Sequence, residues 1–269
     1  MRVFIAVDLE GICGVVGERQ AEPEGPLYRD ACRAMRADLD AVLAGCAAAG
    51  VAETVVCDAH YHGTNLSAEA LPPWVTLVAG SGPHSMLQGI GPGFDAALFV
   101  GYHARAGTQA AVLEHTWTYK LFDVSVGDVS LGEFGLGALL AGHFGVPAVY
   151  VSGDDKAVAE AQALAPGITG TVVKRGVSRT CAELRPPDPV RREIRADVER
   201  ALSTTPPRPL VWDGTPMRLT FTRVCFCDAA AQAPGVRRVD GRTLAFGAED
   251  YERLYTTFLA CLDLAATAD

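Results

Sequence analysis

No stretch of this 269-residue chain reaches the roughly 18 consecutive apolar residues that a membrane-spanning helix requires. The N-terminal apolar run, Val3–Val7, is short and ends at Asp8. It has neither the basic stretch before it nor the small-residue cleavage site after it that mark a secretory signal. We therefore expect this run to form a strand, and we expect a cytoplasmic protein that does not bind membranes.

The chain also lacks clusters of lysine and arginine, and its formal net charge is −9. Because nucleic-acid-binding proteins need a basic surface, we expect no nucleic-acid partner. The eight cysteines are scattered and no export signal accompanies them, which favours free buried thiols over a disulfide framework. Cys225 and Cys227 lack the spacing of a zinc knuckle, and alternation is expected to place both thiols on one face of a strand.

Residues 1–165 alternate between strand-like and helix-like segments. Helical spacing of apolar residues predicts one helix from about residue 28 to residue 49, with Gly50 as its stop, and another over Gly132–Phe144. The predicted strands are Val3–Val7, Thr54–Cys57, Val75–Val78, Ala96–Val100 and Ala148–Val151. This alternation predicts an α/β domain over 1–165, with a mainly parallel sheet covered by helices on both faces.

Residues 166–269 have a different pattern, which predicts a second, smaller α+β domain. Asp188 is expected to cap a helix that ends near Ser203. Asp213-Gly214 is a typical hairpin turn between two apolar runs. The elements expected in this domain are a strand over Ile168–Lys174, the helix Asp188–Ser203, the hairpin strands Pro209–Trp212 and Met217–Val224, and a final amphipathic helix that carries Leu254 to Leu262.

Ionisable side chains follow three of the predicted strands in the first domain. They are Asp8 and Glu10 after the first strand, His60 after the second and His103 after the fourth, with Glu133 at the start of a helix. A carboxylate after a strand is often only a turn or cap residue. However, the carboxyl ends of parallel strands meet at one sheet edge, where acidic groups repel each other unless a cation or a proton intervenes. Mixed histidine and carboxylate ligands suit zinc, and this set is large enough for two ions if one carboxylate bridges them.

A dinucleotide-binding fold is the main rival for a sheet of this kind. Its first turn needs a three-glycine fingerprint, whereas this chain has the segment Glu10-Gly11-Ile12-Cys13-Gly14. The carboxylates at this turn would also repel a pyrophosphate. The sequence therefore disfavours a nucleotide cofactor.

Several motifs occur together along the chain and make it recognisable. They are Asp8-Leu9-Glu10-Gly11, Asp58-Ala59-His60, Leu98 to Arg105, His115, Gly132 to Leu136, Gly153-Asp154-Asp155, and Lys174 with Ser178-Arg179. With these motifs in this order, the chain resembles the DppA-type D-aminopeptidases over nearly its whole length. This is a bacterial family of self-compartmentalising zinc peptidases.

The resemblance implies the roles of individual residues. The family's zinc ligands fall on Asp8, Glu10, His60, His103 and Glu133, with Asp8 bridging two ions, and its catalytic histidine falls on His115. The resemblance further implies hydrolysis of an N-terminal D-amino acid, such as D-alanine, from short peptides. It also implies a homo-oligomer, a decameric ring that encloses the active sites. His115 is expected to move protons or to act as a nucleophile.

Two other functions remain open at this point. One is another metal-dependent hydrolase, for example one that acts on nucleosides, which would need Asp8 and Glu10 but not the two histidines. The other is a non-catalytic peptide-binding protein that contains a metal. Three further residues have open roles: His62 as a substrate contact, Arg105 as a partner for a peptide carboxylate, and Asp58 as either an orienting partner of His60 or a cap.

Overall fold

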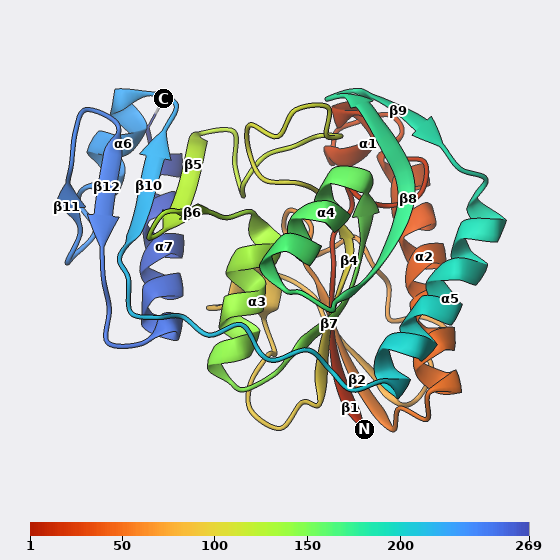
Figure 1. Ribbon diagram of the computed structural model, residues 1–269. Coiled ribbons are helices and arrows are strands. Elements are labelled where there is room, and N and C mark those ends of the chain that lie inside the picture. The colour runs from red at the N-terminus through yellow and green to blue at the C-terminus, as the bar shows by residue number, and fades with distance from the viewer. Residues whose placement is uncertain (269) are drawn as a thin grey trace.

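The computed structural model describes residues 1–268 and contains two β-sheets, which lie beside one another in Figure 1. The larger sheet has seven strands in the order β3-β2-β1-β4-β7-β8-β9, and every neighbouring pair is parallel except β8 and β9. Its strands are β1 (Arg2–Val7), β2 (Glu53–Asp58), β3 (Val75–Val78), β4 (Ala96–Tyr102), β7 (Ala148–Asp154), β8 (Thr169–Ser178) and β9 (Cys181–Leu184).

Helices cover both faces of this sheet because its central strands are apolar on both faces. On β1, Val3 and Ile5 pack into one apolar cluster, whereas Phe4 and Ala6 pack into the other. The first cluster includes α2 (Tyr28–Ala48) and α5 (Pro187–Ser203), and the second includes α3 (Glu133–His143) and α4 (Asp155–Leu164). A short helix, α1 (Glu18–Ala21), follows β1. The predicted α/β fold with a mainly parallel, helix-covered sheet is confirmed.

The smaller sheet has five antiparallel strands in the order β11-β12-β10-β5-β6. Its elements are β5 (Leu121–Val126), β6 (Val129–Ser130), β10 (Met217–Phe221), β11 (Arg237–Arg238) and β12 (Thr243–Phe246), with the helices α6 (Val224–Ala230) and α7 (Tyr251–Ala266). Strands β5 and β6 precede residue 165, whereas β8 and β9, which follow it, belong to the larger sheet. Each sheet thus contains strands from before and from after residue 165. The division into domains 1–165 and 166–269 stays a prediction.

Three predictions of local structure in the second half are wrong. No hairpin forms around Asp213-Gly214, because β10 pairs with the distant strands β5 and β12 and leaves residues 209–212 without a partner strand. The chain after β10 turns into α6, so Cys225 and Cys227 lie on a helix and not on one face of a strand. The helix α5 begins at Pro187 after Pro186, so Asp188 lies in its first turn and is not its cap. Among residues 1–268, no helix combines the length and apolarity that a membrane crossing requires.

Candidate metal centre

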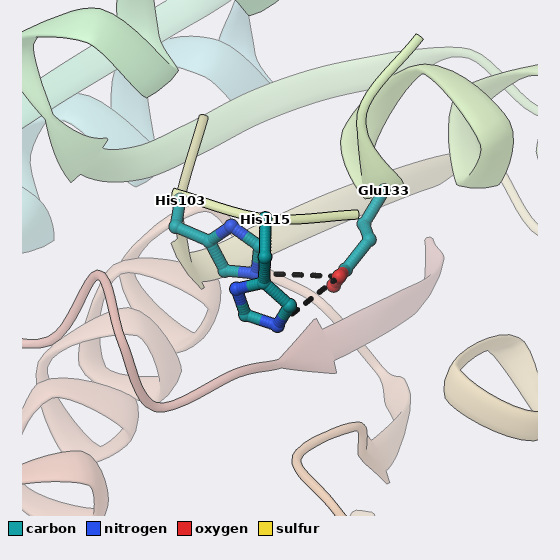
Figure 2. A group of neighbouring side chains, drawn as sticks. All are labelled: His103, His115 and Glu133. Carbon is teal, nitrogen blue, oxygen red and sulfur yellow. Dashed lines mark ion pairs between the residues drawn. The ribbon is translucent and has the colours of Figure 1, made fainter. Parts of the chain in front are cut away.

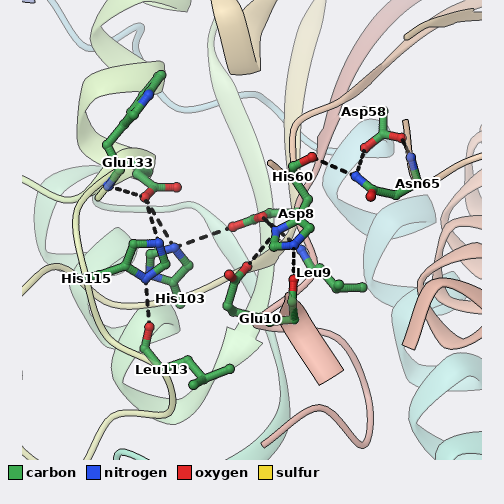
Figure 3. Close-up of polar contacts among 12 residues, drawn as sticks. Asp8, Leu9, Glu10, Asp58, His60, Asn65, His103, Leu113, His115 and Glu133 are labelled. Atoms are coloured by element: carbon green, nitrogen blue, oxygen red, sulfur yellow. Dashed lines mark hydrogen bonds and ion pairs between the residues drawn. The ribbon is translucent and has the colours of Figure 1, made fainter. Parts of the chain in front are cut away.

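The carboxyl ends of β1, β2 and β4 bring the predicted site residues together (Figure 3). Asp8 and His103 directly follow β1 and β4, and His60 comes two residues after β2. Glu133 is the first residue of α3, and His115 lies in the loop between β4 and β5. The structure therefore gathers all six predicted residues, Glu10 included, and buries five of them: Asp8, Glu10, His60, His103 and Glu133.

Two glycines allow the loops after β1 and β4 to approach each other closely. A Cβ atom on Gly11 would lie 2.1 Å from the carbonyl oxygen of Tyr102, and one on Gly101 would lie 2.3 Å from that of Asp8. The Gly11 N–H donates to the Gly101 carbonyl at 2.7 Å, and Gly101 has a φ of +71°. Both positions need glycine, and their close contact brings the two loops that carry Asp8 and His103 together.

Lys174, a fully buried residue on β8, holds the loop that carries Glu10. Its Nζ donates to the carbonyls of Glu10 at 2.5 Å, Ile12 at 3.0 Å and Val15 at 2.6 Å, which uses all three N–H groups. Burial lowers the pKa of Lys174 to about 8. The sequence comparison singled out this lysine without assigning it a role, and the structure shows that it anchors the backbone beside the site.

We expect the Lys174→Met variant to lose about 3 kcal/mol or more of unfolding free energy, because three buried carbonyls would each lose a charged donor. Urea unfolding measures this loss. The matched control is Lys156→Met, because Lys156 is partly exposed and pairs with its neighbour Asp155, which is worth less than about 1 kcal/mol. Equal losses in the two variants would contradict the anchoring role of Lys174.

Each histidine of the site is fixed through one ring nitrogen to a backbone carbonyl. Metal-binding histidines in proteins show this arrangement, because the fixed N–H sets the tautomer and leaves the other nitrogen to bind the ion. The bonds run from His60 Nε2 to Ala21 at 2.7 Å, from His103 Nδ1 to Ala104 at 3.0 Å, and from His115 Nδ1 to Leu113 at 2.8 Å.

The opposite ring nitrogens face carboxylates. His60 Nδ1 lies 3.1 Å from both Asp8 Oδ1 and Glu10 Oε2. His103 Nε2 lies 3.5 Å from Asp8 Oδ2 and 3.3 Å from Glu133 Oε1. Asp8 stands between the two groups in Figure 3 and directs one oxygen to each, which is the arrangement of a bridging carboxylate.

His115 lies beside His103 and Glu133 (Figure 2). Its ring stacks on that of His103 with a centroid distance of 4.0 Å, and its Nε2 lies 3.7 Å from Glu133 Oε1. The Trp117 N–H donates to the same carboxylate oxygen at 2.6 Å. His103, His115 and Glu133 can together hold a metal ion, so His115 is within reach of a ligand role as well as a proton-transfer role.

The charges of the cluster call for a cation. Burial and the neighbouring charge of Glu10 raise the pKa of Asp8. Burial would also raise the pKa of Glu10, but positive charge on His60 and His103 lowers it well below the usual range. Burial would lower the pKa values of both histidines, and the carboxylates raise them instead. The carboxylates therefore draw protons onto these rings, and a bound metal ion would satisfy the same demand.

Three buried atoms support this conclusion directly. Asp8 Oδ2, Glu10 Oε2 and His103 Nε2 have no hydrogen-bond partner within residues 1–268. Ligand atoms of the same three residues lie within 4.8 Å of one another. Buried polar atoms without partners are rare in proteins, so a group of them with this chemistry fits a metal ion.

A cavity of about 200 Å³ opens onto the cluster. Besides five of the site residues, it is lined by Ala59, Tyr61, His62, Ser85, Met86 and Trp117. Sequence reasoning found His62 but missed the others, since none of them carries a carboxylate or an imidazole and none follows a periodic pattern.

The two remaining candidates lie outside this cavity. The guanidinium of Arg105 donates to the carbonyl of Ala106, and Arg105 does not line the cavity. The Asp58 carboxylate accepts N–H bonds from Asn65 and Leu66, and Asn65 in turn donates to the His60 carbonyl. Asp58 thus stabilises the turn that carries His60, and no hydrogen bond joins it to the imidazole within residues 1–268.

This chain is similar to known proteins over nearly its whole length. The profile of the D-aminopeptidase family matches residues 1–260. A D-aminopeptidase of Bacillus subtilis (strain 168) is 30% identical over 275 residues, which cover 98% of each chain. Among solved structures, the Zn-dependent D-aminopeptidase DppA from Bacillus subtilis, a self-compartmentalizing protease, matches with a TM-score of 0.97 and 30% identity, over 100% of this chain and 99% of that one. This chain therefore belongs to the D-aminopeptidase family and is a metallo-aminopeptidase.

Proposed function

We propose that this protein is a zinc-dependent aminopeptidase that removes an N-terminal D-amino acid, such as D-alanine, from short peptides. One observation carries the proposal: three histidines, each fixed by a backbone carbonyl, direct their other nitrogen toward buried carboxylates. The relative with the matching fold is described as Zn-dependent, which supports zinc over other cations.

Two zinc ions fit the ligand set. Glu10 and His60 would hold one ion and His103 and Glu133 the other, with Asp8 shared between them. When bound, the ions supply positive charge that polarises the scissile carbonyl, acidifies a water molecule and holds the free amino group of the substrate. Three carboxylates in a buried site balance most of that charge, as a site for two dications requires.

We assign proton transfer to His115. Because its Nδ1–H is held by the Leu113 carbonyl, its Nε2 carries the free lone pair in the neutral ring. That nitrogen lies 3.7 Å from Glu133 Oε1, and His115 lines the cavity, so we assign it to accept a proton from the attacking water and deliver it to the departing amine. Stacking on His103 limits rotation of the ring, so the nitrogen keeps this position.

Selection of the D-enantiomer would come from the cavity wall. A metal pair that holds the amino group can process either enantiomer, and discrimination needs a wall that accepts the Cα substituent on one side and clashes on the other. Ser85 and Met86 begin a short 3-10 helix, η1 (Ser85–Leu87), and both line the cavity. They are the side chains that we expect to contact the substituent.

The test is a panel of D- and L-alanyl dipeptides and tripeptides. We expect D-alanyl peptides to be cleaved at least about tenfold faster than the L-forms, equivalent to about 1.4 kcal/mol of discrimination. N-acetylation should abolish turnover, because it removes the free amine. Equal rates for both enantiomers would remove the D-specific part of the proposal. Cleavage of acetylated peptides would remove the aminopeptidase itself, and binding without cleavage would leave the peptide-binding alternative.

We also propose that the protein is cytoplasmic and assembles into a decameric ring that encloses the active sites. The structural relative's description as self-compartmentalizing supports a closed assembly. Static light scattering at micromolar concentration should give a mass about ten times the 28.3 kDa chain. A mass near that of one chain would contradict the assembly.

A further inference from the structure

A second, larger cavity adjoins the cavity at the metal centre. Its volume is about 390 Å³, and the two share three wall residues, Tyr61, Ser85 and Trp117. The metal-site cavity alone, at about 200 Å³, is smaller than the roughly 300–1,000 Å³ usual for small-molecule sites, whereas both together fall in that range.

The backbone is strained at all three shared residues. Their φ angles are +55° at Tyr61, +46° at Ser85 and +66° at Trp117. Within residues 1–268 only six residues other than glycine have a positive φ, so half of them stand at this junction. Bulky residues rarely adopt this conformation, and proteins keep such strain mainly at functional sites. The strained backbone at the junction therefore indicates that a ligand extends from one cavity into the other.

One face of α7 forms the far wall of the second cavity. Thr256, Leu259, Ala260 and Asp263 have the i, i+3, i+4, i+7 spacing of one helix face, and all four line the cavity. The loop Ser81-Gly82-Pro83 contributes another part of the wall. Asp263 is the charged residue of this lining, and within residues 1–268 no basic side chain contributes to it.

A third cavity, of about 260 Å³, shares one wall residue, His115, with the cavity at the metal centre. Its cationic residue, Arg179, is already engaged. The guanidinium lies 2.8 Å from Glu18 Oε1 and 3.8 Å from Glu114 Oε1, and it stacks over the ring of Tyr119. An arginine paired in this way is poorly placed to hold a substrate carboxylate.

We propose that the cavity against α7 binds the part of the peptide beyond the scissile bond, and that it favours neutral or basic residues over acidic ones. This inference rests on the proposed function. The N-terminal residue occupies the cavity at the metal centre, and the following residues pass between Tyr61, Ser85 and Trp117 to reach α7. The preferred substrates are accordingly tripeptides or longer peptides with a basic or uncharged residue after the first.

The first experiment fills the cavity. Ala260 is exposed on α7, so Ala260→Trp should fold normally while its indole occupies the space. We expect kcat/KM for D-alanyl-glycyl-glycine to fall about tenfold or more, and that for D-alaninamide, which has no residue beyond the scissile bond, to stay within about twofold. The matched control is Ala266→Trp, at an exposed position of the same helix outside the cavity, which should leave the rates for both substrates unchanged.

The second experiment tests charge. In the wild-type protein, D-alanyl-lysyl-glycine should be cleaved faster than D-alanyl-glutamyl-glycine. Asp263→Lys should reduce that ratio of kcat/KM values by about tenfold, because the exposed side chain changes sign beside the bound residue. An unchanged ratio together with no length-dependent effect of Ala260→Trp would overturn the inference while the enzyme stays active. A wild-type protein that cleaves none of these peptides would instead overturn the proposed function, and the inference with it.

Discussion

Replacing His115 with alanine is expected to lower kcat by about 10²–10⁴ and to leave the zinc content unchanged. The reason is geometric: the imidazole is fixed by Leu113 and by stacking on His103, and His115 lines the cavity where water and substrate would meet. Steady-state kinetics on a D-alanyl tripeptide, with elemental analysis of the same preparation, measures both quantities.

Because His115 is within ligand reach of the same centre, its two possible roles give different outcomes. Loss of zinc in the variant would show that His115 is a ligand, and full activity would show that it takes no part in catalysis. The control is His62→Ala, which removes an exposed histidine from the wall of the same cavity. We expect its kcat to stay within about threefold of the wild type, since His62 carries no proton-transfer role here.

Replacing Asp8 with asparagine is expected to reduce bound zinc from about two ions to about one and to lower kcat/KM by at least a factor of about 10³, or about 4 kcal/mol. Both carboxylate oxygens face ring nitrogens, one toward His60 and the other toward His103. An asparagine keeps the shape but turns one of the two acceptors into an NH₂ donor, which cannot bind a cation. The zinc ion on the side that the NH₂ group faces, either that of His60 or that of His103, should be lost.

A neighbouring carboxylate outside the cluster provides the control. Glu114 adjoins His115 in the sequence, but its oxygens accept from the Gly107 N–H and face Arg179. Glu114→Gln should therefore keep both zinc ions and most of the activity. If Asp8→Asn also kept two ions, the bridging position of Asp8 would be wrong.

The sequence predicted the site's members because of a simple property of parallel sheets. Adjacent parallel strands end at the same edge, so the first one or two residues after β1, β2 and β4 must lie close together. Asp8, His60 and His103 were located in this way from strand ends alone, and the motifs of the family added His115. Their roles as ligands and catalyst remain predictions that the experiments above address.

The walls of the site could not be predicted in the same way. Tyr61 and Trp117 lie in loops and Ser85 begins the short helix η1, and all three have strained backbone, for which the sequence has no periodic signal. Lys174 matched a family motif, but its role depends on three carbonyls that lie about 160 residues earlier in the chain.

Long-range pairing also explains the errors in the second half. Asp213-Gly214 has the composition of a hairpin turn, and local preference alone would pair the segments around it. In the folded protein β10 instead lies between β5 and β12, and β5 comes from nearly 100 residues earlier. Non-local partners outweighed the local turn, and the same exchange places β5 and β6 in the smaller sheet.

The central claim is that the buried cluster around Asp8 is a two-zinc catalytic centre. The most direct measurement is the zinc content per chain of protein purified without chelator, determined together with the hydrolysis rate of a D-alanyl peptide. We predict about two zinc ions per chain, loss of hydrolysis when a chelator removes them, and recovery when zinc is returned. Metal-free protein that hydrolyses the peptide at the full rate would contradict the account.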